Sequence, residues 1–326
     1  MMRWGAQRAP GRLRVLVLAV SDRCDQRCAH CSIWVGGRAR GRTLSRAERL
    51  AIAEEAIADG VSAALLTGGE PLLAADLWPI AERLHGAGVR LMLATNGMRL
   101  EPHAAAVGRL FAEVYVSLDG GRPVTHDGLR GVSSWARLAA GVAALRAAAP
   151  RVRRVARCTL HAANLHELAA VIAQARSAGF DAVSFLPLDA SSEAFGGDVA
   201  ARRTLVPSVA AVRALEADID GLEAAGAFDD GFVLEDAAKL RRLARHLAAS
   251  AGAARFERPA CDAPWWSMVV EADGTVRPCF FQPAVGQAAQ GLRAVRASAG
   301  YRAALRAISE DNATCQRCVC PKRAAR

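Results

Sequence analysis

The sequence contains no long uncharged apolar run and no clear targeting segment. No stretch of about 18 consecutive apolar residues occurs, so the sequence offers no candidate for a membrane-spanning helix. The basic stretch up to residue 14 leads only into a short apolar run, 15–20, and the following Ser21-Asp22-Arg23 matches a signal-peptide cleavage site poorly. We therefore expect a cytoplasmic protein.

Lysine is nearly absent, although the net charge is +10. Only Lys239 and Lys322 are lysine, and the remaining positive charge is arginine, accompanied by abundant alanine. Codon bias in a high-GC genome produces this composition, so we interpret the charge as a solvated basic surface rather than as the mark of an acidic partner. No basic block with interleaved aromatic residues occurs, and a nucleic-acid partner is therefore not expected.

The composition also excludes a disordered chain and a secreted disulfide framework. Hydrophobic residues make up 52% of the sequence, and 326 residues suffice for one large α/β domain with or without a small second domain. The nine cysteines are odd in number and clustered at both ends of the chain. In a reducing compartment such clusters are typical of metal ligands. Cys158, which lies on an apolar strand, is interpreted as a core cysteine.

Three cysteines fall within eight residues, in the segment Cys24-Asp-Gln-Arg-Cys28-Ala-His-Cys31. They directly follow an apolar run, 13–20, that has the character of a buried strand. Four thiolates would close a structural zinc or iron–sulfur site, whereas three leave one metal position open for chemistry. A zinc site would need a fourth ligand. His30 is the nearest candidate, but its place between Cys28 and Cys31 in the sequence makes it a poor one.

Strands and helices alternate after this segment. Ser45 and Glu48 form a capping box that begins the first helix. The predicted strands are 62–67, 89–94, 112–118, 152–160 and 182–188, and the predicted helices are 45–58, 75–87, 101–109, 135–148 and 165–178. Together with the first strand and a helix after the last, these elements make six β/α units and predict a parallel sheet with helices outside. A partial (β/α)6 TIM-like barrel and a doubly wound sheet both satisfy the pattern.

Polar motifs end three of these strands, where α/β folds gather functional groups. The motifs are Thr67-Gly68-Gly69-Glu70-Pro71, Thr95-Asn96-Gly97 and Val116-Ser117-Leu118-Asp119-Gly120. Two adjacent glycines let the backbone approach a ligand closely, and Glu70 offers a carboxylate to an ammonium group. Taken alone, each motif is explained equally well by turn formation.

The segments 207–226 and 235–250 have the periodicity of connecting helices. Past residue 256 the character of the sequence changes, and Asp273-Gly274 is the turn of a predicted β-hairpin. A short helix at about 292–308 precedes the last cysteines. We predict a basic N-terminal extension at 1–12, a main domain at 13–205, connecting helices at 206–254 and a small α+β domain at 255–326.

Five cysteines belong to this last region: Cys261, Cys279, Cys315, Cys318 and Cys320. Four thiolates from two distant segments would staple a domain that is too small to have much core of its own. A zinc ribbon is the structural alternative.

The C-x3-C-x2-C spacing resembles the signature of the radical S-adenosylmethionine (SAM) superfamily, in which three cysteines hold a [4Fe-4S] cluster and SAM chelates the fourth iron. The resemblance implies that Cys24, Cys28 and Cys31 are the cluster ligands. The Gly-Gly-Glu motif is similar to the family motif that holds the amino group of SAM. Ser117-x-Asp119-Gly120, followed by His126-Asp127-x-x-Arg130, resembles the branch that includes anaerobic sulfatase-maturating enzymes. The SAM-binding residues implied in this way are Gly68, Gly69, Glu70, Asn96, Ser117, Asp119 and Arg130.

The C-terminal cysteines, with the pattern Gly274-x4-Cys279, resemble the SPASM/Twitch extension of radical SAM enzymes. A full SPASM domain has seven cysteines and two auxiliary clusters, so the five cysteines here favour the one-cluster Twitch form. The resemblance implies one auxiliary [4Fe-4S] cluster with the ligands Cys261, Cys279, Cys315 and Cys318. Cys320 is then spare, or it replaces Cys318.

The resemblance implies an enzyme that cleaves SAM reductively to a 5′-deoxyadenosyl radical, which abstracts a hydrogen atom from the substrate. A fully ligated auxiliary cluster would accept the electron left on the substrate, which makes the net reaction an oxidation. A small reductase protein, flavodoxin or ferredoxin, is expected as the electron donor. The motifs identify no catalytic base.

We expect the substrate to be a ribosomally made peptide, as is common among SPASM/Twitch proteins. We expect no leader-binding domain ahead of residue 13, and this weighs against the peptide. Oxidation or epimerisation of a small metabolite, such as a sugar or aminocyclitol, is the alternative. A zinc-binding interaction module is the non-enzyme alternative.

Overall fold

The computed structural model describes residues 11–36, 42–192, 194, 198–310 and 312–320. Nearly all of the predicted N-terminal extension lies outside these residues. Among the described residues no helix is long and apolar enough to cross a membrane.

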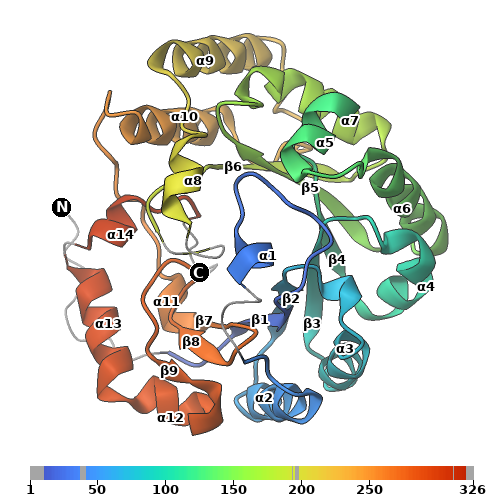
Figure 1. The fold of residues 1–326 in the computed structure, drawn as a ribbon, viewed down its shortest axis with the longest axis vertical. Coiled ribbons are helices and arrows are strands. Elements are labelled where there is room, and N and C mark those ends of the chain that lie inside the picture. Colours follow the sequence, from blue (N-terminus) through green and yellow to red (C-terminus); the bar gives the residue numbers. More distant parts are fainter. Residues whose placement is uncertain (1–10, 37–41, 193, 195–197, 311, 321–326) are drawn as a thin grey trace.

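Six parallel strands form the wall of a barrel, with helices on its outer side (Figure 1). They lie side by side in the order of the chain: β1 (Val15–Ser21), β2 (Ala63–Gly68), β3 (Arg90–Thr95), β4 (Glu113–Ser117), β5 (Arg153–Leu160) and β6 (Ala182–Pro187). A doubly wound sheet would reverse its strand order, and this sheet does not. The predicted partial barrel is confirmed, and the sheet stays open: among the described residues the outer side of β6 carries only an isolated bridge between Val183 and Val233 and no further strand.

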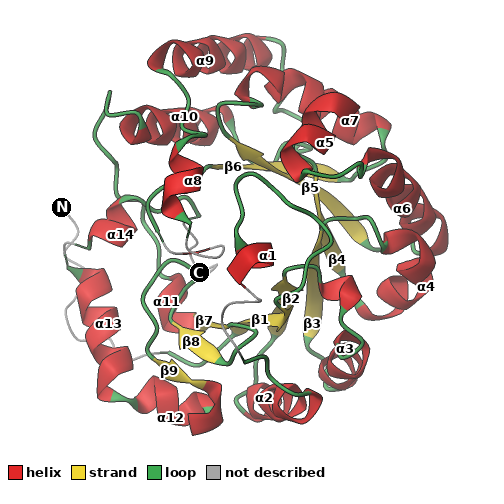
Figure 2. Ribbon diagram, in the orientation of Figure 1, coloured by secondary structure: helices red, strands yellow, loops and turns green. Residues whose placement is uncertain are grey.

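Helices cover the outer face of this wall (Figure 2). The main ones are α2 (Arg46–Ala58), α3 (Leu77–Gly86), α4 (Leu100–Leu110), α6 (Trp135–Ala148), α7 (Leu168–Ser177), α9 (Val209–Ala224) and α10 (Ala237–Ser250). The predicted capping box is confirmed, because Glu48 N donates to Ser45 Oγ at 3.3 Å and Ser45 N donates to Glu48 Oε2 at 2.8 Å. Every predicted strand and helix of the barrel exists, with ends shifted by a few residues.

The two faces of the strands differ in burial, and this difference creates the site. Over most of β1, β2 and β3 buried residues alternate with partly exposed ones. Leu16, Leu66 and Leu93, for example, have no exposed surface. The partly exposed positions, such as Thr67 and Ala94, line a cavity inside the barrel. The core therefore lies between sheet and helices, and the inner face is free for a ligand.

In the described part of the chain, five short helices occur that were not predicted from the sequence. They are α1 (Ile33–Gly36), α5 (Pro123–Arg130), α8 (Val199–Arg203), α11 (Ala263–Trp266) and α14 (Ala313–Gln316). A short 3-10 turn (Pro71–Leu73) also follows β2, and two more such turns cover Leu165–Glu167 and Ala288–Gln290. Of these elements, α5 matters most for the site because Arg130 is its last residue.

The predicted helix at 292–308 is divided into α12 (Leu292–Ala297) and α13 (Ala299–Ser309). Ser298 has extended backbone angles, and its Oγ accepts a hydrogen bond from Tyr301 N at 3.0 Å. A serine that caps the second helix in this way ends the first one.

The predicted C-terminal hairpin is present and continues the barrel sheet. β7 (Ser267–Val270) pairs antiparallel with β8 (Thr275–Arg277), which pairs with β9 (Gly286–Gln287). The turn residue Gly274 has a φ of +89°, a value that favours glycine. On its other side β7 pairs in parallel with β1, so the C-terminal region lies beside the strand that leads to the first cysteine cluster. The domain limits stay predictions, because one sheet runs across the boundary near 255.

Candidate active site

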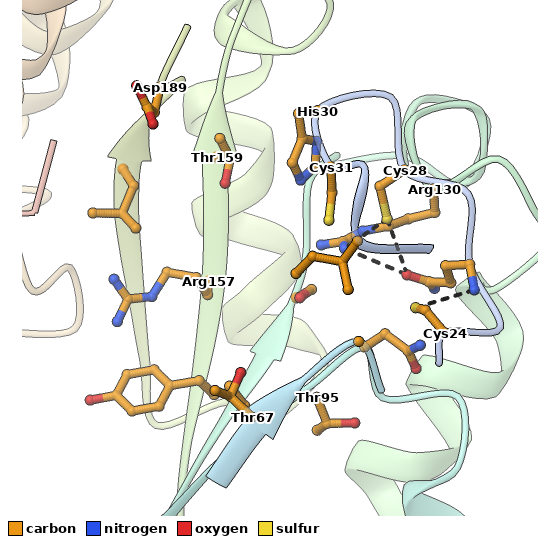
Figure 3. Close-up of a pocket in the computed structure, with 18 of the residues that line it drawn as sticks. Cys24, Cys28, His30, Cys31, Thr67, Thr95, Arg130, Arg157, Thr159 and Asp189 are labelled. Carbon is orange, nitrogen blue, oxygen red and sulfur yellow. Dashed lines mark hydrogen bonds between the residues drawn. The ribbon is translucent and has the colours of Figure 1, made fainter. Parts of the chain in front are cut away.

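The loop after β1 directs three thiols into the barrel. Cys24, Cys28 and Cys31 line one cavity of about 250 Å³ (Figure 3). Burial raises the pKa of Cys24 to about 11 and that of Cys31 to about 12. Thiols of this kind become thiolate ligands when a metal supplies the positive charge. In the described part of the chain, no three Cys, His, Asp or Glu side chains lie close enough together to hold a single metal ion.

Backbone hydrogen bonds attach this loop to α5. Arg27 N donates to Arg130 O at 2.9 Å, and Ala29 N donates to Leu129 O at 3.0 Å. The helix that follows β4 therefore supports the loop that follows β1. The position of the thiols depends on a contact between segments about 100 residues apart.

The end of β2 supports the same loop from the other side. A Cβ atom on Gly68 would lie 2.1 Å from Ser21 O, and one on Gly69 would lie 2.3 Å from Arg23 O. Gly68 also has a φ of +138°, which side chains rarely allow. Both glycines line the cavity, and their first physical role is to let β2 meet the cysteine loop without a gap.

Glu70 lies behind the cavity wall and is fully buried. Its carboxylate accepts hydrogen bonds from Leu72 N at 3.0 Å, Thr95 Oγ1 at 2.8 Å and Asn96 N at 2.7 Å. Burial raises the pKa of Glu70 to about 7, against the lowering effect of these donors. The carboxylate thus ties the ends of β2 and β3 together, and its contact with a ligand stays a prediction.

Asn96 does line the cavity, and it joins β3 to the cysteine loop. Asn96 Nδ2 donates to Asp25 Oδ1 at 2.7 Å, and the other oxygen of Asp25 accepts from Arg99 Nε at 2.9 Å. Asp25 directly follows Cys24, so this bond helps to orient the first thiol.

Arg130 and Asp119 form a buried ion pair at the wall of the cavity. Arg130 Nη2 lies 2.7 Å from Asp119 Oδ2, and Arg130 Nη1 lies 3.4 Å from Cys28 Sγ. Burial alone would raise the pKa of Asp119, but the Arg130 guanidinium holds it below its usual range. Asp119 Oδ1 also accepts a hydrogen bond from Thr159 N at 2.8 Å. Arg130 and Ser117 line the cavity, whereas Asp119 lies behind them.

Several cavity residues have no motif and were not singled out from the sequence. Tyr115, Arg157 and Thr159 come from the inner face of β4 and β5, and Phe281 comes from the C-terminal region. The alternation of strand residues would have placed Tyr115 on the same face as Ser117, and Arg157 on the same face as Thr159. Asp189, at the end of β6, also lines the cavity (Figure 3).

A second pocket lies in the C-terminal region and is lined by four cysteines: Cys261, Cys279, Cys315 and Cys318. Burial raises the pKa of Cys279 to about 12. Gln282 Nε2 lies 3.3 Å from Cys315 Sγ, which gives this thiol a polar neighbour. Cys320 does not line this pocket. Phe281 lines both cavities and so forms a common wall between them.

Cys158 has no exposed surface and belongs to the hydrophobic core, as predicted.

An open parallel barrel with a triplet of thiols at the carboxyl ends of its strands, and a second thiol set beside it, defines a class of iron–sulfur enzymes. The radical SAM superfamily model matches residues 18–187, and the model of the SPASM iron–sulfur cluster-binding domain matches residues 261–319. The chain belongs to the radical SAM superfamily and carries a C-terminal SPASM iron–sulfur domain. Its cofactors are SAM, a [4Fe-4S] cluster and auxiliary iron–sulfur.

Curated relatives match only part of this chain. An AdoMet-dependent heme synthase of Methanosarcina barkeri is 34% identical over 41% of this chain and 40% of its own length. A GTP 3',8-cyclase of Erythrobacter litoralis is 32% identical over 63% of this chain and 62% of its own. The mycofactocin maturase MftC of Mycolicibacterium smegmatis is 30% identical over 34% of this chain and 29% of its own. The chain therefore spans less than two thirds of these relatives.

Solved structures with this fold cover almost the entire chain. Streptococcus suis SuiB bound to its precursor peptide SuiA has a TM-score of 0.68 and 14% identity, over 94% of this chain and 71% of that one. The native anSMEcpe with bound AdoMet and Cp18Cys peptide has a TM-score of 0.62 and 16% identity, over 94% of this chain and 86% of that one. At these identities the likeness shows the fold alone.

Proposed function

We propose that the chain oxidises a ribosomally made peptide by radical SAM chemistry, with the two cysteine sets in their predicted roles. The observation that carries the proposal is the pairing of two thiol sets, three lining the barrel cavity and four lining the adjacent pocket. A set of three leaves one iron of a [4Fe-4S] cluster open to SAM, and a set of four leaves none.

The side chains at the first site fit a cluster and SAM. Cys24, Cys28 and Cys31 would hold the cluster, and the backbone of Gly68 and Gly69 reaches the cavity without side chains. When bound, this pair supplies a 5′-deoxyadenosyl radical. The chain positions the nucleoside and excludes water.

Polar residues around the thiols would hold the rest of SAM. Ser117 and Asn96 offer hydrogen-bonding groups inside the cavity, and Arg130 brings a positive charge beside Cys28. Asp119 keeps that guanidinium in place, and Glu70 keeps Asn96 in place. We assign Asp119 and Glu70 to positioning because both lie behind the cavity wall.

The second pocket fits one auxiliary [4Fe-4S] cluster held by Cys261, Cys279, Cys315 and Cys318, the Twitch form. Its complete thiol set leaves no iron for a substrate, so its role is to accept an electron. The net reaction is then an oxidation, and Phe281 separates the two sites. A flavodoxin or ferredoxin would supply the electron for SAM cleavage.

A peptide substrate is supported by the similarity in fold, over 94% of this chain, to two structures that were solved with peptides bound. A small phosphorylated substrate is the second candidate, since two relatives that are 32% identical over 63% and 59% of this chain are GTP 3',8-cyclases. Incubation with GTP under reducing conditions tests this second candidate directly.

Metal content and two variants test the proposal. The anaerobically purified protein should be brown, with about eight iron and eight sulfide per chain. Cys28→Ala should abolish reductive SAM cleavage, whereas Cys279→Ala should still form some 5′-deoxyadenosine but no oxidised product. Deuterium transfer from labelled candidate substrates into 5′-deoxyadenosine identifies the attacked C–H. A colourless zinc protein, or full SAM cleavage by the Cys28 variant, would refute the assignment.

A further inference from the structure

One arginine inside the barrel stands apart from the others. Arg157 lies on the inner face of β5 and lines the cavity, and its guanidinium stacks on Tyr115 with 4.7 Å to the ring centroid. Figure 3 shows the side chain extending away from Cys24 and Cys28. Tyr115 precedes Ser117 by two residues on β4, whereas Arg157 is the strand partner of Ser117. The Arg157 side chain therefore starts at the level of the predicted SAM contact Ser117 and reaches to the ring of the deeper Tyr115.

Nearby arginines are neutralised, and Arg157 is not. Arg130 pairs with Asp119 at 2.7 Å, Arg154 with Asp181 at 2.7 Å, and Arg153 lies 3.9 Å from Glu113. Among the residues that the structure describes, no carboxylate lies within 4.0 Å of the Arg157 guanidinium and no side-chain hydrogen bond holds it.

Asp189 is the one carboxylate among the described residues that line the cavity, and it lies 3.6 Å from Arg202 Nη1 instead of pairing with Arg157. Leu186, Leu188 and Phe281 add apolar side chains to the lining of the same cavity. Arg157 is half-buried and has an aromatic ring but no anion as its partner. A guanidinium in this position is best complemented by a planar carboxylate, which it binds with two parallel hydrogen bonds. Stacking on an aromatic ring leaves the edge of the guanidinium free for that purpose.

Tyr115 is itself held in place. Burial, together with a hydrogen bond to Glu113, raises the pKa of Tyr115 to about 12. Glu113 Oε2 in turn lies 3.0 Å from Arg90 Nη2. The partner of Tyr115 is thus itself held by an ion pair at the amino-terminal ends of β3 and β4. The arrangement fixes the plane of the Arg157 guanidinium before any ligand arrives.

We propose that Arg157 binds a carboxylate of the substrate and that Tyr115 positions it for this contact. The inference rests on the proposed function and narrows it to a peptide that brings an acidic side chain, or its own C-terminal carboxylate, into the barrel. Arg130 serves the end of the cavity near the cluster, and Arg157 serves the opposite end.

Short peptides test this specificity without knowledge of the natural substrate. The probes are acetyl-Ala-Glu-Ala-amide, acetyl-Ala-Gln-Ala with a free C-terminal carboxylate, and the fully amidated acetyl-Ala-Gln-Ala-amide, titrated calorimetrically into the reconstituted enzyme with SAM. At least one carboxylate peptide should bind about tenfold more tightly than the amidated one. The better of the two carboxylate probes identifies the source of the anion.

Variants of two arginines on the same strand locate the effect. The preference should vanish in Arg157→Gln, fall in Arg157→Lys, which keeps the charge but loses the planar fork, and persist in the matched control Arg153→Gln. Tyr115→Leu should weaken the preference, and Tyr115→Phe should retain most of it. Thermal unfolding of each variant shows that it is folded.

Two results would overturn the proposal: equal binding of all three peptides by the wild-type enzyme, or a preference that survives Arg157→Gln. A third measurement distinguishes a contact between Arg157 and the substrate from a contact between Arg157 and SAM. The KM for SAM in substrate-free formation of 5′-deoxyadenosine should be unchanged in Arg157→Gln, and a large increase would mean that Arg157 binds SAM instead. Failure of the wild-type enzyme to cleave SAM would count against the proposed function and not against this contact.

Discussion

Asp119 and Arg130 form an ion pair of 2.7 Å in which the two side chains are only 1% and 8% exposed. The same guanidinium lies 3.4 Å from Cys28 Sγ. A strand-end motif and the last residue of α5 therefore act together on the predicted cluster site. This connection makes the stability of the barrel and the geometry of the thiols depend on each other.

Removal of one partner of this pair should destabilise the fold strongly. Arg130→Ala leaves the Asp119 carboxylate buried without its counter-ion, and we expect the free energy of unfolding to fall by about 3 kcal/mol. Denaturant unfolding measures the change. The double variant Asp119→Asn/Arg130→Gln buries no charge and should recover part of the loss. A single variant as stable as the wild type would show that the pair does not hold this region together.

The same pair predicts an acid-sensitive fold. The folded-state pKa of Asp119 lies below the ordinary value of 3.8. Its stabilising effect is therefore complete above about pH 4 and is lost as the pH falls through the lowered pKa. Unfolding measured between pH 5 and pH 2 should lose stability more steeply in the wild type than in Asp119→Asn. Parallel curves would contradict the prediction.

Glu70 should show the opposite pH dependence. Its pKa is raised from 4.5 to about 7, so the folded protein binds this proton more tightly than the unfolded chain does. Acidification from pH 7 to pH 4.5 should therefore increase the contribution of Glu70 to stability, and Glu70→Gln should remove that slope. At pH 7 the amide also places an NH2 group near donors that need an acceptor, which costs about 1–3 kcal/mol. Thr95→Val, which removes one donor, is the milder control.

The glycines after β2 allow a test with a matched control. Gly68→Ala should destabilise the protein by at least about 2 kcal/mol, because its Cβ would lie 2.1 Å from Ser21 O at a strained φ. Cluster incorporation should fall as well, measured as iron per chain and absorbance. Gly86→Ala, at a helical position with no atom within 4 Å of the new Cβ, should be neutral or stabilising. Similar effects of the two substitutions would argue against a close packing requirement at Gly68.

The auxiliary site predicts a contrast between two neighbouring cysteines. Cys318 lines the second pocket and Cys320 does not. Cys318→Ser should lower the iron content from about eight toward about four per chain, whereas Cys320→Ser should leave it unchanged. Electron paramagnetic resonance of the reduced proteins distinguishes which cluster is lost. A loss of iron in the Cys320 variant alone would exchange the two roles.

Local patterns predicted much of this protein. The capping box at Ser45 and Glu48, the six strands and the Asp273-Gly274 turn follow from residues close together in the chain. Helix α5 was missed because it is short and contains Gly128 in its interior, which weakens the helical pattern. The break at Ser298 was missed because the apolar periodicity runs on through the cap.

The candidate site also contains residues that local motifs predicted and residues that they did not. The Cys24–Cys31 triplet and the Gly-Gly-Glu motif are contiguous, so their spacing alone indicated a cluster and a close approach of the backbone. Arg157 has no such motif. It became a candidate only once β5 was placed beside β4 and no carboxylate of the described residues was found near its guanidinium.

The sequence by itself determined the β/α order, the thiol sets and the family to which they point, because these depend on spacing within short segments. Only the tertiary structure decided that β7 pairs with β1, that Asp119 binds Arg130, and that Phe281 lines both pockets. Those relationships join residues far apart in the chain, and they are decided by which faces pack together and which charges are buried with a partner.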